Sequence, residues 1–344
     1  MSHTRRRVLS TAMLGAASAV TGACSADRPK PNATRALAKV TYLTGLGAFG
    51  REAFAWVADA KGYFRDAGLQ VTIVPGAAGD ENLKKIAGGA AQFGIIDYSG
   101  AVIRAGKRAF DAFRLVAALN NQTLIAIMSL VGRGITIPAD LRGKTIAQAE
   151  GAVVKTLFPG YARLAGLDPS GVHWTEVAAT NLPALLASGK VDAIGQFVVG
   201  RPAVAAAAKR PVGDVITLPY STYMTDPYGN ALVTSKQLID TNPELVKRFT
   251  AALIKGLVYA VANPEESGRI LHAAVPASNP DTAAAELRLL TNYVGRSASG
   301  APIGVFEPAK VSRGIALMQS LGQFPTAYSV DQVVWFGAID GKDR

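Results

Sequence analysis

Short apolar runs alternate with amphipathic stretches along most of the chain from Lys39 onward. Runs rich in β-branched and aromatic residues predict strands, and the longer stretches with helical periodicity predict helices. The predicted strands cover residues 40–43, 71–74, 93–97, 115–118, 144–147, 172–177 and 191–194. The predicted helices cover residues 52–64, 81–87, 100–108, 153–164, 182–186 and 201–209. Strands separated by helices form βαβ units, so we expect an α/β fold with mostly parallel sheets.

The last third of the chain is predicted to be mostly helical. Its best-defined helix begins at Asn242, a good N-cap, with Pro243 at the first helical position and Glu244 in the first turn. Apolar residues recur at every fourth position from Leu245 to Val261 and form one stripe. We expect this stripe to pack in the core and to have no chemical role.

The first 24 residues have the pattern of an export signal: a basic start, an apolar middle and an end of small residues. Arg5-Arg6-Arg7 followed by Val8-Leu9 resembles a twin-arginine signal. Gly22-Ala23-Cys24 resembles the end of a lipoprotein signal, which predicts lipidation of Cys24 and a location outside the cytoplasm. Thr21 stands where leucine is usual, and the alternative is an incidental cysteine in a poorly ordered tail. Residues 25–37 contain two prolines and predict a flexible tether.

Composition narrows the function classes. Of the 344 residues 49% are hydrophobic, and after the leader no run of 18 apolar residues occurs, so we expect a soluble globular body. With Cys24 as the only cysteine, disulfides, thiolate metal sites and a cysteine nucleophile are not expected in that body. The formal net charge of +11 favours an anionic ligand weakly. The basic residues are dispersed and only 7% of residues are aromatic, so no nucleic-acid partner is expected.

Motifs for catalysis or cofactor binding are weak. Gly45, Gly47 and Gly50 match the spacing of a dinucleotide fingerprint, but no acidic residue follows about 20 residues later to hold a ribose hydroxyl. His173 and His272 lie far apart without cysteines or paired acids at ligand spacing, so no metal site is expected. We find no nucleophile–base pair in the sequence, and we therefore expect neither a cofactor nor an enzyme activity.

Five segments in order resemble the signatures of solute receptors for ABC importers. They are residues 62–71 (Gly-Tyr-Phe-Arg-Asp-Ala-Gly-Leu-Gln-Val), 88–95 (Gly-Gly-Ala-Ala-Gln-Phe-Gly-Ile), 140–146 (Asp-Leu-Arg-Gly-Lys-Thr-Ile), 185–193 (Leu-Leu-Ala-Ser-Gly-Lys-Val-Asp-Ala) and 228–249. The last segment is similar to the branch that binds pyrimidine precursors of thiamine, which is close to the sulfonate and nitrate receptors. Their glycines are expected to occupy turns that need a positive φ.

The resemblance implies a periplasmic-binding-protein fold of the second type, with two α/β lobes, a hinge and a ligand cleft between the lobes. Residues 38–122 and 226–344 are expected to form lobe I, and residues 123–225 lobe II, with crossings near 120–123 and 220–228. The implied partners are a small-molecule ligand, a permease and an ATPase, with the receptor a monomer held at the membrane by its lipid. In the pyrimidine branch a histidine and a tyrosine follow the first strand, where this chain has Glu52 and Trp56.

Ligands of open α/β sheets bind beyond the carboxyl ends of the strands, where helix N-termini present free N–H groups. That rule and the aromatic or polar character of nearby side chains select the candidate ligand-binding residues. They are Gly47, Phe49, Arg51, Trp56, Asp97, Tyr98, Ser99, Glu150, Gly151, Ala152, Gln196, Phe197, Asp226 and Tyr228. For several of them a structural role is the alternative: Trp56 and Tyr98 in the core, Asp226 in a turn, and Arg51 solvated.

The leading hypothesis is a receptor that captures a small heteroaromatic ring, neutral or anionic, and delivers it to a permease. The first alternative is a receptor for small oxyanions such as sulfonates or nitrate. The second is an exported enzyme that uses the same cleft, and the third is a receptor-like module used in signalling or adhesion.

Overall fold

The computed structural model describes residues 36–77, 79–108, 112–297 and 299–339. The predicted export signal, the lipidation site Cys24 and nearly all of the tether therefore lie outside the described residues. Leu37–Arg344 form one compact unit. Within the described part of this unit, none of the helices combines the length and the apolarity that a membrane crossing requires.

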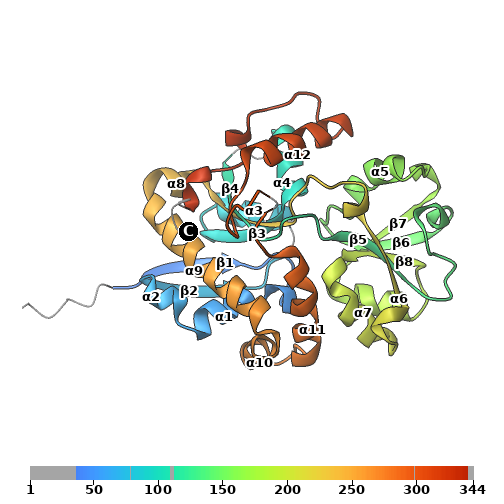
Figure 1. The fold of residues 1–344 in the computed structure, drawn as a ribbon, viewed down its shortest axis with the longest axis horizontal. Helices are drawn as coiled ribbons and strands as arrows, with labels where there is room; N and C mark the ends of the chain where they lie inside the picture. Colours follow the sequence, from blue (N-terminus) through green and yellow to red (C-terminus); the bar gives the residue numbers. More distant parts are fainter. Residues whose placement is uncertain (1–35, 78, 109–111, 298, 340–344) are drawn as a thin grey trace, which may run out of the picture. The chain divides into compact units, whose positions relative to one another are not determined.

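The unit contains two five-stranded sheets (Figure 1). The first has the order β2 (Leu69–Val74), β1 (Ala38–Leu43), β3 (Phe93–Asp97), β10 (Asn230–Ser235), β4 (Phe113–Ala118). The second has the order β7 (His173–Val177), β6 (Thr145–Ala149), β8 (Ala193–Phe197), β5 (Ile125–Leu130), β9 (Val215–Pro219). We refer to the first sheet and the helices packed on it as lobe I, and to the second as lobe II.

Each sheet contains one reversed strand among four that run in the same direction, so the sheets are mostly parallel, as expected, but mixed. β10 is antiparallel to both β3 and β4, and β5 is antiparallel to both β8 and β9. β5 and β10 are also the first strands that the chain enters after passing from one sheet to the other. Their first residues pair with the last residues of β8 and β3, Ile125 with Phe197 and Asn230 with Asp97. Both crossings therefore run between the side of the first sheet where β3 ends and the side of the second sheet where β8 ends.

Twelve α-helices of the described residues cover the sheets. They are α1 (Phe54–Ala60), α2 (Tyr63–Asp66), α3 (Gly79–Ala87), α4 (Tyr98–Gly106), α5 (Val154–Leu164), α6 (Leu182–Ala187), α7 (Arg201–Ala208), α8 (Lys236–Thr241), α9 (Pro243–Ala262), α10 (Pro264–Ala274), α11 (Pro280–Leu290) and α12 (Pro308–Ser320). The single helix expected over residues 52–64 is wrong. It is divided into the short 3-10 helix η1 (Gly50–Glu52), α1 and α2, and Gly62, with φ of 75°, separates α1 from α2.

Helix α9 carries the predicted apolar stripe into the core of lobe I. Its Phe249 ring stacks on Phe93 of β3 at 4.0 Å and on Phe64 of α2 at 5.3 Å between centroids. Asn242 accepts a hydrogen bond from the Leu245 amide at 3.1 Å, which caps the helix. The stripe is a packing surface, as the sequence predicted.

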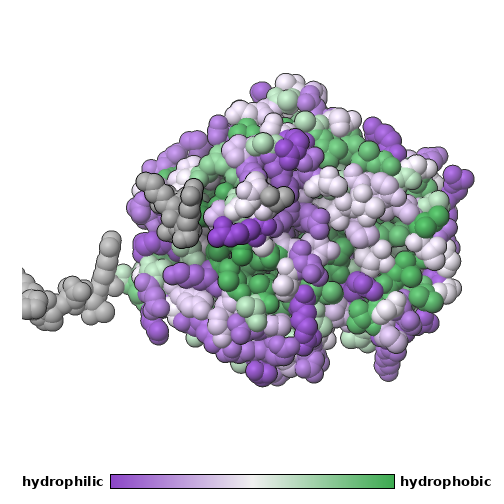
Figure 2. Space-filling model, viewed as in Figure 1, coloured by the Kyte–Doolittle hydropathy of each residue, from purple (hydrophilic) through white to green (hydrophobic). Residues whose placement is uncertain are grey.

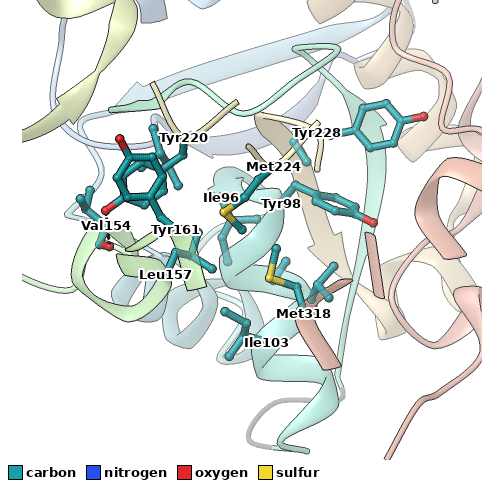
Figure 3. Close-up of a cluster of buried hydrophobic side chains, with 14 of the residues drawn as sticks. Ile96, Tyr98, Ile103, Val154, Leu157, Tyr161, Tyr220, Met224, Tyr228 and Met318 are labelled. Carbon is teal, nitrogen blue, oxygen red and sulfur yellow. Dashed lines mark hydrogen bonds between the residues drawn. The ribbon is translucent and has the colours of Figure 1, made fainter. Parts of the chain in front are cut away.

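One hydrophobic cluster draws its members from both lobes (Figure 3). Leu157 and Tyr161 of α5 and Tyr220 belong to the cluster together with Ile103 of α4 and Met318 of α12. The two sheets are thus joined by a shared core as well as by the two crossings. Helix α11 adds a further link, because it packs against η1 in lobe I and against α7 in lobe II.

Large hydrophobic side chains that stay exposed are scattered over the described surface. They are Leu37, Val131, Ile137, Leu164, Val212, Tyr223 and Val258. The face drawn in Figure 2 accordingly shows hydrophobic and hydrophilic residues side by side over both lobes. We assign no function to these positions.

Candidate ligand-binding cleft

A narrow cavity lies between the ends of strands from both sheets. Lobe I contributes Gly45 and Leu46 after β1, the end of β3 and the start of β10, and lobe II contributes residues 151–154 and Phe197. Apolar side chains from both lobes, including Leu46, Ile95, Val153 and Phe197, form most of the wall. The cavity volume is about 60 Å³. This is the position that the strand-end rule predicts.

Asp97 is the acidic group of this cavity. Its side chain caps α4, since one carboxylate oxygen accepts a hydrogen bond from the Gly100 amide at 3.1 Å. The other oxygen, Oδ2, is buried and has no hydrogen-bond partner among the described residues. Burial raises the pKa of Asp97 to about 7, although the backbone amides of Gly100 and Ser99 oppose the shift. The carboxyl group can therefore accept one more hydrogen bond.

Arg104 lines the same cavity but is engaged elsewhere. Its guanidinium forms an ion pair with Asp80 and donates to the carbonyl oxygen of Gly100 at 2.9 Å. Asn230 completes the polar lining, and its backbone amide donates to the side chain of Asn120 at 3.1 Å. This hydrogen bond links the start of β10 to the crossing segment that follows β4.

A second, smaller cavity adjoins the first and shares Leu46, Ala152, Val154 and Phe197 with it. Its distinctive member is Arg51 of η1, which is only 3% exposed. The guanidinium carbon lies 4.2 Å from the centre of the Phe49 ring in lobe I and 5.2 Å from that of Phe197 in lobe II. The Nε and Nη1 atoms have no hydrogen-bond partner within the described chain.

Two buried carboxyl groups accompany Arg51. Glu286 of α11 accepts a hydrogen bond from the Arg51 backbone amide at 3.1 Å, while its other oxygen stays 4.0 Å from Arg51 Nη1. Glu52 lies behind Gly45, where an added Cβ would come within 2.9 Å of Glu52 Oε1. Burial raises the pKa of Glu52 to about 7, and Arg51 opposes that shift. Gly45 is therefore required by the space that the Glu52 carboxyl group occupies.

Outside these cavities a wider groove runs along α4 and the start of α5. It is lined by charged residues that are largely paired with each other, Arg104 with Asp80 and Lys155 with Glu176, the latter pair at 3.3 Å. Lys107 also lines it. Because these charges compensate one another, the groove offers little net attraction for a small ion.

The structure brings half of the predicted site residues to the two cavities. These residues are Phe49, Arg51, Asp97, Gly151, Ala152, Gln196 and Phe197. Sequence reasoning missed Leu46, Arg104 and Asn230 as lining residues. Asn230 could have been found as the first residue of a strand next to the end of β3, had that strand been predicted.

Several predicted ligand contacts are corrected to packing positions. Tyr98 and Tyr228 are almost completely buried, meet edge-to-face at 5.4 Å and belong to the cluster in Figure 3. The Tyr98 hydroxyl donates to the Val311 carbonyl at 3.2 Å, and the Tyr228 hydroxyl accepts from the Glu307 amide at 3.0 Å. Trp56, on α1, packs in the core of lobe I. An aromatic side chain near a strand end can face either the cleft or the core, and these three face the core.

The remaining predicted residues line neither cavity. Ser99 is fully buried in the first turn of α4, and Glu150 is exposed in the turn after β6. Asp226 forms an ion pair with Arg313 at 2.7 Å, which explains its position better than a ligand contact does. Gly47 adopts a φ of 81° in the loop after β1, where its amide donates to the Gly76 carbonyl at 2.9 Å. Among the described residues no group of three or more His, Cys, Asp or Glu side chains could hold a metal ion.

Comparison with known proteins gives a family match and several relatives. Residues 52–267, more than half of the chain, match the family model described as NMT1/THI5 like. A formylaminopyrimidine-binding protein of Halalkalibacterium halodurans is 27% identical over 63% of this chain and 65% of its own length. The riboflavin-binding protein RibY of Chloroflexus aurantiacus is 24% identical over 70% of this chain and 67% of its own length. The chain thus spans about two thirds of the length of these relatives.

The fold is shared with solved receptor structures. The alkanesulfonate-binding protein SsuA from Xanthomonas axonopodis pv. citri, bound to MOPS, superimposes with a TM-score of 0.66. The match covers 87% of this chain and 98% of that protein at 17% sequence identity. At this identity the similarity establishes only the fold, the two-sheet α/β fold of periplasmic binding proteins.

Proposed function

Because the chain belongs to the NMT1/THI5-like family, we propose that it is an extracytoplasmic solute-binding receptor of an ABC importer. Its ligand in this proposal is a small nitrogen heterocycle, similar to a pyrimidine or a thiamine precursor. The observation that supports this ligand class best is Asp97, which lines an apolar cavity between the lobes and whose buried Oδ2 has no partner in the described part of the chain. A ring N–H or an amino group on a flat ring would satisfy that oxygen.

The lining of the cavity favours a ring over a small oxyanion. Apolar walls with a few fixed polar groups are typical of sites for small organic molecules. Nitrate or a sulfonate would have to approach the Asp97 carboxyl group, and Arg51, the one buried cation among the described residues, already has Glu286 beside it. The relatives named for formylaminopyrimidine and riboflavin agree with a ring.

The mechanism in this proposal is binding coupled to closure. The cavity offers about 60 Å³, well below the roughly 300–1,000 Å³ of ordinary ligand sites, so a ring enters only when the lobes separate. We propose lobe I as residues 38–122 with 226–344, lobe II as residues 123–225, and the two crossings as the hinge. A ligand that contacts both lobes stabilises the closed state by its higher affinity for that state.

The proposal includes export and anchoring. A lipid on Cys24 would hold a monomeric receptor beside its permease and ATPase, and residues 25–37 would act as the tether. In a fractionated host, the full-length protein is expected in the membrane fraction, and the Cys24→Ala variant in the soluble extracytoplasmic fraction. Equal distribution of the two proteins would contradict the anchor and leave the receptor role standing.

An exported enzyme that uses the same cleft is the rival from another class. The cavity-lining residues of the described chain include no serine, cysteine or histidine that could pair with a base. Binding followed by release, without turnover, is therefore the activity that we propose.

A thermal-shift and calorimetric screen tests the proposal. The panel contains aminopyrimidines, flavins, alkanesulfonates, nitrate and phosphorylated precursors, incubated with the full chain and analysed afterwards for conversion. We expect stabilisation by a ring with an N–H donor and no conversion, and binding about tenfold weaker or worse in Asp97→Asn. The matched control is Glu150→Gln, an exposed carboxylate of the nearby turn. Turnover, or stabilisation by oxyanions alone, would contradict the proposal.

A further inference from the structure

Arg51 occupies an unusual position for a charged side chain. Its guanidinium is only 3% exposed and is enclosed by Phe49 of lobe I and Phe197 of lobe II. Phe197 ends β8, so one side of this enclosure belongs to the opposite lobe. Separation of the lobes would remove that side and open the guanidinium to water.

Glu286 lies close enough to balance the charge of Arg51, but two of the guanidinium nitrogen atoms have no hydrogen bond among the described residues. Glu286 Oε1 lies 4.0 Å from Arg51 Nη1, too far for a hydrogen bond, and Glu286 Oε2 accepts its hydrogen bond from the Arg51 backbone amide. Glu52 offers these donors no acceptor either, since its buried oxygens have no hydrogen-bond partner by geometry among the described residues. The donors at Nε and Nη1 are therefore buried without acceptors. Such donors destabilise a structure more than paired ones stabilise it, and more so when the group is charged.

We propose that closure of the lobes depends on a ligand with an uncharged carbonyl-type oxygen. This oxygen accepts hydrogen bonds from the unpaired N–H groups of Arg51. This inference rests on the proposed receptor function and specifies its ligand further. When the lobes close without such an oxygen, the Nε and Nη1 donors lose their hydrogen bonds to water and gain none. When the ligand supplies the oxygen, the planar donor groups of the guanidinium are hydrogen-bonded in the closed state.

The neighbouring carboxyl groups decide which kind of oxygen fits. A fully charged oxyanion would gain from Arg51 but would lie close to the carboxylate of Glu286, whose Oε1 is 4.0 Å from Arg51 Nη1. A neutral carbonyl gains the hydrogen bonds without that repulsion. With Asp97 accepting a donor in the adjoining cavity, the ligand class is a small ring that has both an N–H donor and a carbonyl acceptor.

The first test needs no ligand. We compare by small-angle X-ray scattering the full chain with the double variant Arg51→Met/Glu286→Gln, which removes the free donors and keeps the charge balanced. Without ligand, the variant is expected to be more compact than the native chain, since its closed state leaves no guanidinium donors unpaired. The exposed substitution Arg65→Met is the control and should leave the scattering unchanged. A double variant that is as open as the native chain, or more open, would overturn the inference.

The second test uses matched pairs of compounds. The probes are 2-pyrimidinone against 2-aminopyrimidine and 4-pyrimidinone against 4-aminopyrimidine, so that both members of a pair carry an N–H donor and only one carries a carbonyl oxygen, with sulfate, nitrate and methanesulfonate as oxyanions. The carbonyl member of a pair is expected to bind the native chain about tenfold more tightly or better, and to compact it. In Arg51→Lys, which keeps the charge and loses the planar fork, this preference should fall to about twofold or less.

The outcomes separate the two hypotheses. Equal binding within the pairs, a preference that survives in Arg51→Lys, or tighter binding of the oxyanions would overturn the role of Arg51 while the receptor function stands. Failure of every ring compound to bind would count against the proposed ligand class, and the scattering comparison would then decide the role of Arg51 by itself.

Discussion

Two buried carboxyl groups, Asp97 and Glu52, make the stability of this fold depend on pH. Burial raises the pKa of each to about 7, from about 4 for an exposed carboxyl group. Between these values the folded protein binds more protons than the unfolded chain, so the free energy of unfolding falls as pH rises through this range. We expect the melting temperature of the ligand-free protein to drop between pH 5 and pH 8.

The variants Asp97→Asn and Glu52→Gln test this dependence. Each removes one titrating group, and asparagine at position 97 can still cap α4, so the decrease in melting temperature over the same pH range should become smaller. Glu150→Gln, in an exposed turn, is the control and should keep the native profile. A native profile that is flat, or that rises toward pH 8, would show that these two groups are ionised in the fold without penalty.

At the scale of elements, the contact between η1 and α11 fixes where Arg51 lies. A Cβ added to Gly50 would come within 2.4 Å of the Ala283 Cα atom in α11, so the two backbones touch here. Gly50→Ala is therefore expected to push α11 away and to lower the free energy of unfolding by about 1–3 kcal/mol. Chemical denaturation measures this change.

Gly213→Ala is the matched control for that substitution. A Cβ at Gly213 meets no atom within 4 Å, so its effect should stay within about 0.5 kcal/mol. If Gly50→Ala were as neutral as Gly213→Ala, α11 would not be held against η1, and the placement of Arg51 beside Glu286 would need another cause.

The elements that the sequence predicted are those with local signals. Strands β1, β2, β3, β4, β6, β7 and β8 and the helices between them follow from alternating apolar runs and turns. Strands β5, β9 and β10 were missed. β5 is buried along its whole length and so shows no alternation, and its partners β8 and β9 lie more than 60 residues away. Pairing over that distance depends on the assembled sheet, which periodicity along the chain does not report.

The candidate site shows the same division. Asp97, Gly151 and Phe197, which the strand-end rule selected, line the first cavity, because the rule depends only on the order of the elements. It could not decide the direction of a side chain, and so Tyr98 and Trp56 were assigned to the ligand although they pack in the core. The unpaired donors of Arg51 are a property of the assembled lobes and leave no trace in the sequence.

At the scale of the whole molecule, the shared core predicts that the lobes unfold together. Tyr161 and Leu157 of lobe II pack in one cluster with Ile103 and Met318 of lobe I, so loss of either lobe exposes apolar surface of the other (Figure 3). The three tryptophans allow a direct measurement, since Trp174 lies in lobe II while Trp56 and Trp335 pack in lobe I. In Trp174→Phe the fluorescence reports lobe I, and in Trp56→Phe/Trp335→Phe it reports lobe II.

We then unfold each variant in urea and record both fluorescence and circular dichroism. In each variant the fluorescence midpoint, which reports one lobe, should coincide with the circular dichroism midpoint, which reports the whole molecule. Leu157→Ala, in the shared cluster, should then lower both midpoints together, with a loss of about 2–5 kcal/mol. Leu186→Ala, at an equally buried position in a cluster within lobe II, should also lower both midpoints, because in one cooperative transition a loss in one lobe is measured in the other. Two separated midpoints, or a Leu157→Ala effect confined to lobe II, would mean that the lobes are independent folding units. In that case the resistance to hinge opening would come from the crossings and α11 alone, because the shared core would contribute nothing to holding the lobes together.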